Sequence, residues 1–344
     1  MDATAGAAKL EIMRQTWCNK LGIATLAVIA FRHELRATAV NLKQLEYFVH
    51  VAELGSFTRA ADHLDIAQPA LSRQVRQLEI KLRQTLLTRN GRGVTPTEAG
   101  RRLLEHGRGI LHQVARAKED MEEMRGAPVG HAALGLPPTV GRILTVTLVD
   151  EFRKRFPKAS VGIVEGLSVG ISEWLASGRI DVGLVYNPAP TPLLETRALV
   201  AEPLYLIGPA SGRRATAKMG PQVQLKELAA HGLIIPSRPN SLRMLVESRL
   251  ADMGERIHVA LEIDGIPAIL DLVARGHGFA VLSLNALRHD PLRAHLLPRP
   301  IVRPALTTTL AVATSAQRPL TPLARQLVEL LVDVVPRELA EHGA

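Results

Sequence analysis

Side chains suited to reading a nucleic-acid duplex are concentrated between residues 68 and 76. Gln68 and Ser72 lie in the first turn of a helical pattern, where an amide can pair with adenine N6 and N7. At about 100° per residue, Arg73 and Arg76 share a face with Pro69, and a guanidinium suits guanine or phosphate. These residue types at this spacing predict contacts to base edges and to the sugar-phosphate backbone.

Two short helices must hold these side chains. The segment 56–79 contains two helical patterns joined by residues 65–67, and the second pattern has an apolar face of its own. That face consists of Leu71, Val75, Leu78 and Leu82. One face of the second helix therefore packs inside the protein, and the opposite face is free to enter a groove of the duplex. This arrangement is typical of a helix-turn-helix. An ordinary surface hairpin with solvated arginines is the alternative.

Local sequence features favour the same two helices. Ser56 can cap the first helix, and Ala60 and Ala61 are small enough to let the second helix cross closely. Pro69 suits a first helical turn, where its missing N–H costs nothing. We expect Ser56, Gln68, Pro69, Ser72, Arg73 and Arg76 to belong to the DNA-binding surface.

A basic, glycine-containing stretch follows the second helix. Residues 88–95 have the composition of a wing, a short hairpin lying against the backbone of the duplex, in which Arg89 and Arg92 would bind phosphate. A tight surface turn closed by its glycines is the alternative. The formal net charge of the chain is +9, which favours a polyanionic partner. Low aromatic content argues against stacking platforms for single strands, so duplex DNA is expected.

The run NLKQLEYFVHVAELGSFTRAADHLDIAQPALSRQVRQLEIKL, followed by LTRNGRGVTPTEAG, resembles the amino-terminal domain of LysR-type transcriptional regulators. Within that family, AQPALSRQV, LRQTLLTR and RGVTPTEAG are similar to the nitrogen assimilation control subgroup. The resemblance covers about residues 41–335. Arg83 and Leu87 depart from the family's usual Gly and Phe, and Arg adopts a left-handed turn at a higher cost than Gly. The resemblance implies double-stranded promoter DNA as a partner and contact with RNA polymerase.

A long helix follows the predicted winged helix-turn-helix of residues 41–98. Over residues 97–125, apolar positions alternate at spacings of four and three, which predicts a seam that seeks a partner. The expected dimerisation residues are Leu103, Ile110, Val114 and Met121. The resemblance implies a linker helix that joins a homodimer or homotetramer; an intramolecular core helix is the alternative. Residues 126–130 then form a hinge.

Beyond the hinge, strand-like runs alternate with amphipathic helices, which predicts two α/β lobes built on a mostly parallel sheet. We expect lobe 1 to comprise residues 131–200 and 303–344, and lobe 2 residues 201–302, so that the chain crosses between lobes twice. The resemblance implies a sensing domain built like a periplasmic binding protein. The fold class is therefore α+β overall: a winged helix-turn-helix, a linker helix and a two-lobed effector domain.

Helix amino termini predict where a small molecule would bind. Thr139 and Ser241 each follow a strand and open a helix, and exposed N–H groups there attract an anion, so a small anionic effector is expected. By resemblance, the pocket positions are Thr139, Gly166, Leu167, Ser237, Asn240 and Ile266. For Thr139, Ser237 and Asn240 taken singly, plain helix capping is the alternative. Val140 departs from the polar residue of some relatives and leaves the effector's chemistry open.

One enzyme motif competes with this interpretation. Residues 166–170, GLSVG, match the nucleophile-elbow pattern, and Asp264 or Asp271 and then His277 follow in the right order for a triad. So short a motif recurs by chance, and few strands precede it, so we expect no catalysis. Asp181 and His277 are expected to be a turn acid and a loop residue. No metal-ligand spacing or phosphate-binding loop is apparent, and no cofactor other than the effector is expected.

The first forty residues form an extension that does not match the rest. The apolar run 21–31 resembles a signal peptide, but charged residues follow it and it is too short to span a bilayer. Translation starting at Val40 and a disordered or loosely helical extension are the two explanations. Cys18 is the single cysteine, which rules out an intramolecular disulfide and is compatible with a reducing cytoplasm.

Overall fold

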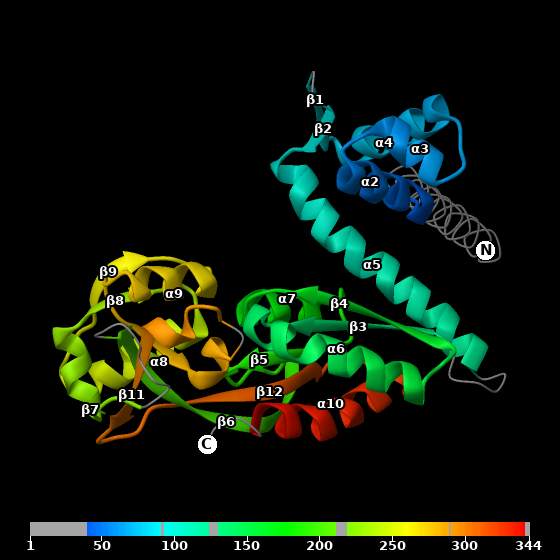
Figure 1. Cartoon of the computed structure of the whole chain (residues 1–344). Coiled ribbons are helices and arrows are strands. Elements are labelled where there is room, and N and C mark those ends of the chain that lie inside the picture. The colour runs from blue at the N-terminus through cyan, green and yellow to red at the C-terminus, as the bar shows by residue number, and fades with distance from the viewer. Residues whose placement is uncertain (1–39, 91–92, 124–129, 211–218, 289, 341–344) are drawn as a thin grey trace, which may run out of the picture. The chain divides into compact units, whose positions relative to one another are not determined.

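The computed structural model describes residues 40–90, 93–123, 130–210, 219–288 and 290–340. The chain divides into two compact units at the boundary between Leu111 and His112. Residues 1–39, Arg92, Met124 and most of the predicted hinge lie outside the described residues. The two units are therefore taken separately below (Figure 1).

The first unit opens with three helices: α2 (Leu42–Leu54), α3 (Phe57–His63) and α4 (Gln68–Leu82). Ser56 caps α3 as predicted, because its side chain accepts the Arg59 N–H at 3.3 Å. Ala60 and Ala61 are buried, which allows close crossing by α4. On α4, Leu71, Val75 and Leu78 are buried, so the predicted apolar face is confirmed.

Arg83 ends α4 in the left-handed conformation, with φ 52° and ψ 37°. The chain thus keeps the turn for which glycine is usual, despite the larger side chain. Glu79 reinforces this turn: one of its carboxylate oxygens accepts the N–H groups of Leu86 and Leu87, at 2.8 and 3.2 Å. Leu87 is buried and is the first residue of the wing. The Glu79 carboxylate therefore holds the end of α4 and the start of the wing together.

The wing is an antiparallel hairpin of β1 (Leu87–Asn90) and β2 (Gly93–Pro96). Gly93 has φ +139°, and a Cβ on it would lie 2.8 Å from the carbonyl oxygen of Gly55. This close approach lets the Val94 N–H donate to Gly55 at 2.9 Å. Only glycine fits here without displacing backbone, so the wing is fixed against the end of α2.

The long helix α5 (Glu98–Glu123) belongs to both units, residues up to Leu111 to the first and those from His112 to the second. Leu103 packs against the helix-turn-helix core, and Gly107 is buried beside Leu45 and Val49. Ile110 and Met121 remain 47% and 62% exposed. The predicted dimerisation seam is therefore not entirely free to contact a partner subunit, because Leu103 packs within its own unit.

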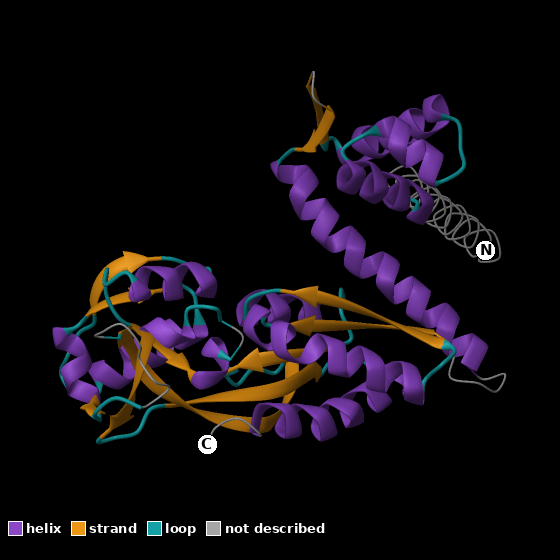
Figure 2. Ribbon diagram, viewed as in Figure 1, coloured by secondary structure: helices purple, strands orange, loops and turns teal. Residues whose placement is uncertain are grey.

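The second unit is built on an eight-stranded sheet, with strand order β4-β3-β5-β12-β6-β11-β7 and β10 also paired to β6 (Figure 2). Its strands are β3 (Gly130–Leu136), β4 (Ala159–Glu165), β5 (Val182–Tyr186), β6 (Leu194–Pro209), β7 (Val223–Gln224), β10 (Ala280–Ser283), β11 (Leu296–Val302) and β12 (Thr307–Ser315). A second sheet pairs β8 (Gly232–Ile235) with β9 (His258–Glu262). The β3, β4 and β5 strands are parallel, but β12 runs antiparallel to β5 and β6. The expectation of a mostly parallel sheet was wrong, because returning strands join it.

Helices cover both faces of this sheet. They are α6 (Pro138–Arg155), α7 (Ser168–Ser177), α8 (Ser241–Ala251), α9 (Ile266–Ala274) and α10 (Pro322–Ala340). Alternate strand residues separate the layers: Leu134, Leu184 and Leu310 pack with α6 and α10, whereas their neighbours Ala133, Val185 and Ala311 pack with α7. Lobe 2 has two further clusters, one around α8 and one around α9.

Two strands connect the lobes. The sixteen-residue β6 pairs with β12 in lobe 1 and with β10 and β11 in lobe 2, and β12 carries the chain back. Both lobes therefore share one sheet, and β6 and β12 are the strands that cross between them. Among the helices of the described residues, none has the length and apolar character needed to cross a membrane.

Candidate DNA-binding surface and effector cleft

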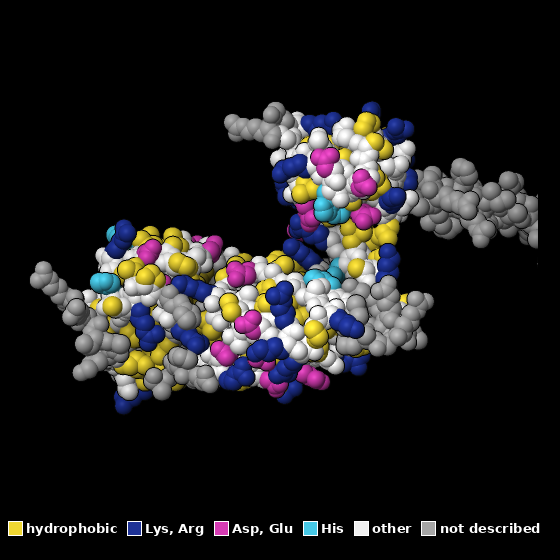
Figure 3. All heavy atoms as spheres, turned by 45° about the vertical axis from the view of Figure 1, so that its right-hand side comes forward, with side chains coloured by type: hydrophobic (Ala, Val, Ile, Leu, Met, Phe, Trp, Pro, Cys, Tyr) yellow, Lys and Arg dark blue, Asp and Glu magenta, His cyan; other side chains and the backbone are white. Residues whose placement is uncertain are grey.

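The outward face of α4 carries the predicted contact residues. Pro69, Arg73 and Arg76 are exposed, and Gln68 and Ser72 are partly buried in the first turns. Arg73 and Arg76 make no ion pair or hydrogen bond within the described part of the chain. Figure 3 shows Lys and Arg side chains on the visible face of this unit, with acidic and histidine side chains between them. The guanidinium groups on α4 are therefore available to an external anion.

Arg89 links the wing to this helix. Its guanidinium lies 4.5 Å from the ring centroid of Phe57 and donates to the Ser72 hydroxyl at 2.9 Å. Arg89 stays exposed, and its five N–H donors exceed what one hydrogen bond uses. It can thus orient Ser72 and still reach a phosphate. Its predicted companion, Arg92, lies outside the described residues.

Other arginines of the basic region are paired within the chain. Arg101 and Arg102 contact Glu98 at 2.7 and 3.4 Å, and Arg108 contacts Glu53 at 2.7 Å. Hydrogen bonds from Arg101 and Arg102, together with their charges, hold the pKa of Glu98 below its usual value. These three guanidinium groups on α5 are therefore partly neutralised by nearby carboxylates, unlike Arg73 and Arg76 on α4.

A buried amide positions α4, which sequence reasoning missed. Gln44 is 4% exposed on α2, and its amide donates to Gln74 and Gln77 at 3.0 and 3.2 Å. Its carbonyl oxygen accepts from Lys81 at 3.1 Å. Four polar side chains at irregular separation carry no periodic signal, so only the fold reveals this network. It fixes the rotation of the recognition helix about its axis.

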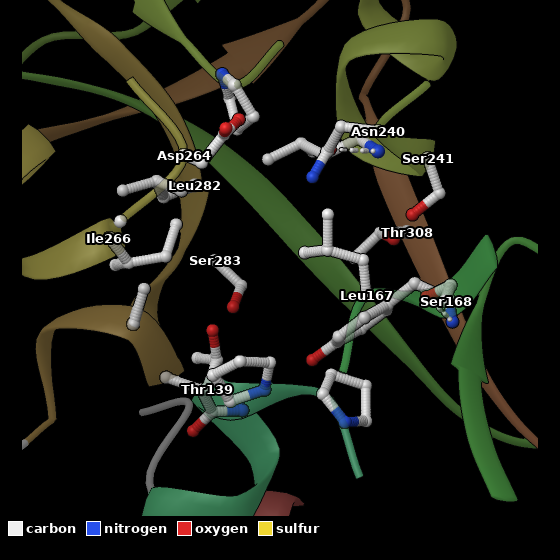
Figure 4. Close-up of a pocket in the computed structure, with 18 of the residues that line it drawn as sticks. Thr139, Leu167, Ser168, Asn240, Ser241, Asp264, Ile266, Leu282, Ser283 and Thr308 are labelled. Atoms are coloured by element: carbon white, nitrogen blue, oxygen red, sulfur yellow. Dashed lines mark hydrogen bonds between the residues drawn. The ribbon is translucent and has the colours of Figure 1, made fainter. Parts of the chain in front are cut away.

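The second unit contains a cavity of about 400 Å³ lined by both lobes (Figure 4). Thr139 and Leu167 line it from lobe 1, and Asn240 and Ile266 from lobe 2, as expected. Apolar side chains contribute much of the remaining wall, among them Ile143, Leu204, Pro236, Leu242, Leu282 and Ala286. A small molecule with an apolar body fits this wall composition.

Two predicted pocket residues do not line the cavity. Gly166 lies against Trp174, where a Cβ would come within 2.5 Å of the indole ring. Ser237 donates its backbone N–H to the Asp264 carboxylate at 2.8 Å, and Asp264 is the one that lines the cavity. Both are therefore positioning residues rather than wall residues in this structure.

Four helices begin at the cavity wall, and they differ in capping. Asn240 accepts the N–H groups of Leu242 and Arg243 at 2.9 and 3.3 Å, so plain capping applies to α8. The helices α6, α7 and α9 have no side-chain cap. Thr139 thus follows an uncapped start of α6, as the sequence suggested.

The charged residues of the wall are Arg142, Glu165 and Asp264. Two carboxylates against one guanidinium do not favour a purely anionic occupant. Glu165 also lies against the first turn of α6, because a Cβ on Gly141 would be 2.6 Å from its carboxylate oxygen. The expectation of an anionic effector considered helix termini alone, and it stays a prediction; the wall adds these three charged side chains.

A buried carboxylate joins the lobes beneath the cavity. Glu202 on β6 is 4% exposed, and it accepts from the Tyr186 hydroxyl and from the Asn285 amide, each at 2.9 Å. Burial and then the charge of Glu202 raise the pKa of Tyr186 well above its usual value. The phenol therefore stays protonated and keeps its hydrogen on Glu202. Tyr186 belongs to lobe 1 and Asn285 to lobe 2, so this network joins the two lobes.

The nucleophile-elbow motif has a different role here. The Ser168 hydroxyl accepts the backbone N–H of Tyr186 at 2.9 Å and lies in the first turn of α7. Among the described residues, no histidine contacts it, and His277 is exposed. Nor does any group of three or more His, Cys, Asp or Glu side chains suited to a metal occur there. Ser168 therefore fixes the end of β5 at the cavity wall.

Asp181 is a buried anchor and not a turn acid. It accepts the Ala133 N–H at 2.8 Å, and its other oxygen lies 3.2 Å from His112 and 3.1 Å from Arg116, both on α5. Burial tends to raise the pKa of Asp181, but the hydrogen bond and charge of His112, with Ala133 and Arg116, bring it below its usual value. The carboxyl-terminal part of α5 is thus fixed to lobe 1.

Known proteins share this architecture. The bacterial regulatory helix-turn-helix domain of the lysR family matches residues 42–101, and the LysR substrate binding domain matches residues 125–336. The chain belongs to the LysR family of transcriptional regulators. It has the family's DNA-binding domain and effector domain in the same order, and the resemblance drawn from the sequence is confirmed.

Among LysR-family relatives, the nitrogen assimilation regulatory protein nac of Escherichia coli (strain K12) is 32% identical over 303 residues, covering 88% of this chain and 97% of that protein. The nac protein of Klebsiella aerogenes is also 32% identical, over 88% of this chain and 98% of that protein. The crystal structure of CbnR, a LysR family regulator, has a TM-score of 0.63 at 24% identity and covers 85% of this chain and 98% of CbnR. Full-length CbnR complexed with its target DNA has a TM-score of 0.62 at 26% identity, with the same coverage.

Proposed function

We propose that this LysR regulator binds promoter DNA as a homodimer or homotetramer, with α4 of two subunits in successive major grooves. The observation that carries the proposal is the outward face of α4, where Arg73 and Arg76 have no intramolecular partner among the described residues while the opposite face is buried. The wing and Arg89 would contact the backbone beside each groove. A relative, CbnR, has been crystallised with its target DNA, which supports the same mode of binding here.

We further propose that a small molecule in the cleft between the lobes regulates this binding. The effector would shift the population of lobe arrangements about the β6–β12 pair and so alter the spacing or bend imposed on DNA. Asp181, His112 and Arg116 offer a physical route, because they join α5 to lobe 1. Contact with RNA polymerase at the promoter, in the bacterial cytoplasm, completes the proposal.

Catalysis is not part of the proposed function. Ser168 uses its hydroxyl to accept from Tyr186, and the apolar cavity walls suit binding of a small molecule. Treatment with a serine-directed phosphonate is expected to leave Ser168 unlabelled. Covalent labelling of Ser168 would contradict this part of the proposal and revive a hydrolase.

A mobility-shift assay with the full chain tests the DNA-binding proposal. The variant in which Arg73 and Arg76 are both alanine should lose promoter binding. The matched control replaces Arg101 and Arg102, which are paired with Glu98, and should retain most of it. Equal loss in both variants would mean that net charge and not the α4 face binds DNA.

A further inference from the structure

Ser283 is a largely buried residue that lines the effector cleft. It is 9% exposed, and no hydrogen bond involves its side chain within the residues that the structure describes. Figure 4 shows its hydroxyl directed into the cavity, on the side of Thr139. The hydroxyl faces the cavity and is not used by the chain, so it can exchange a hydrogen bond with a polar group of an occupant.

The positive helix ends around the cleft are already matched by groups of the chain itself. The Glu165 carboxylate lies at the first turn of α6, and Asp264 immediately precedes Gly265, the N-cap of α9. At α8, the Asn240 side chain occupies the first N–H donors. An anion entering the cleft would therefore meet two carboxylates. The start of α7 has no side-chain cap, and Glu165 lies two residues before its N-cap Leu167.

Several wall groups can act only as hydrogen-bond acceptors. Asp264 uses one carboxylate oxygen for the Ser237 N–H, and its other oxygen has no partner in the described chain. Glu165 likewise has no ion pair or hydrogen bond there. Tyr186 keeps its hydrogen on Glu202, so its oxygen can only accept from a cavity ligand. Glu165 and Asp264 are exposed at the cavity mouth or wall and can accept from a cationic donor, and an ammonium group supplies three N–H bonds.

We propose that the cleft binds a zwitterionic α-amino acid with an apolar side chain, and that the ammonium group is the required element of recognition. The carboxylates of Glu165 and Asp264 match the ammonium. The Ser283 hydroxyl and the uncapped start of α7 match the ligand's carboxylate, while the apolar walls take its side chain. This inference rests on the proposed effector function and names the chemical class of the effector.

Calorimetric titration of the full chain with matched compounds tests the proposal. Each apolar proteinogenic L-amino acid is titrated, and any that binds is compared with its deaminated acid and its decarboxylated amine; for leucine these are 4-methylpentanoate and 3-methylbutylamine. At least one amino acid should bind. Its deaminated acid and its amine should each bind at least about tenfold more weakly, because each lacks a charge-assisted set of hydrogen bonds.

Conservative variants locate the binding groups. Glu165→Gln and Asp264→Asn should each weaken amino-acid binding by about tenfold or more. Ser283→Ala should weaken it less, because it removes an uncharged hydroxyl. Glu173→Gln, on α7 and outside the cavity wall, is the matched control and should bind like the parent chain. Unchanged mobility shifts with promoter DNA show that the variants fold.

Three results would overturn the proposal. The first is equal or tighter binding of the deaminated acids. The second is unchanged amino-acid affinity in both carboxylate variants, and the third is no binding by any apolar amino acid. A compound of another class that alters DNA binding would, in those cases, leave the proposed effector function standing while the amino-acid class is rejected.

Discussion

At the scale of single residues, neighbours decide whether an arginine serves the fold or an outside partner. Arg101 and Arg102 hydrogen-bond with Glu98, whereas Arg73 and Arg76 project from α4 without any such partner in the described chain. Both pairs of arginines lie in the same basic stretch of the sequence, and the position of Glu98 is what distinguishes them. Only the arginines that are not paired within the chain should therefore be counted as available to DNA.

Gln68→Ala is expected to relax sequence preference. An amide that pairs with adenine N6 and N7 contributes discrimination at one base pair, so the variant should lose about 1–3 kcal/mol of it at that position. Competition binding against operators that differ by one base pair gives this number. A uniform loss over all positions would show that Gln68 has no reading role.

Arg73→Ala should weaken binding to every duplex by a similar factor. If Arg73 neutralises one phosphate, the slope of log K against log salt should become shallower by about 0.9. Binding isotherms at several salt concentrations measure the slope, and Arg102→Ala supplies the comparison. A changed base preference with an unchanged slope would assign Arg73 to a base instead.

The Asp181 anchor predicts an acid-dependent loss of stability. Because its folded pKa lies below the ordinary value of 3.8, its contribution is complete above pH 3.8 and is lost as pH falls through the folded pKa. Asp181→Asn should remove this loss and lower stability at neutral pH by about 3–5 kcal/mol, since Arg116 stays buried without its counter-ion. Urea unfolding followed by circular dichroism from pH 3 to 7 tests both.

The exposed pair of Glu98 and Arg101 is the control for this experiment. Glu98→Gln should leave stability at neutral pH nearly unchanged, because water screens an exposed ion pair. An Asp181 variant that loses no more than Glu98→Gln would contradict the assignment of Asp181 as an anchor between α5 and lobe 1.

At the scale of elements, the wing depends on one backbone position. Gly93→Ala should destabilise the first unit by about 2 kcal/mol, because alanine is strained at φ +139° and its Cβ would meet the Gly55 carbonyl oxygen. Thermal unfolding detects the loss, and amide exchange at Val94 should accelerate. An unperturbed Val94 N–H in the variant would mean that the hydrogen bond to Gly55 does not fix the wing.

Periodic elements could be predicted from sequence, and irregular ones could not. The apolar face of α4 followed from four leucine and valine positions, because a helix needs one buried stripe. The first half of the sixteen-residue β6 could not be predicted. This half is exposed and has no apolar pattern, and it pairs with β12, which lies far away in the sequence.

The site was predictable where function depends on a local motif. Residues at helix starts, such as Thr139 and Asn240, do reach the cavity wall. Glu165 and Asp264 were missed as wall groups, and Glu202 as the group that joins Tyr186 to Asn285, because these carboxylates lie on separate strands and loops that only the fold brings to the cleft. The charge of the cleft could therefore not be inferred from the helix starts alone.

At the scale of the whole molecule, the proposed assembly depends on the exposed part of the α5 seam. Ile110→Glu and Met121→Glu should each raise the dimer dissociation constant by at least about tenfold, because burial of an apolar side chain is replaced by burial of a charge. Sedimentation analysis provides the measurement. Ala115→Glu introduces the same charge at an exposed position off the predicted seam and should leave the assembly intact.

The central claim is that the outward face of α4 enters the major groove. Dimethyl sulfate protection tests it most directly, because the reagent methylates guanine N7, which faces that groove. The account predicts two protected patches about one helical turn apart on promoter DNA, both lost when Arg73 and Arg76 are replaced by alanine. Bound DNA with fully reactive guanine N7, or protection that survives the double replacement, would contradict it.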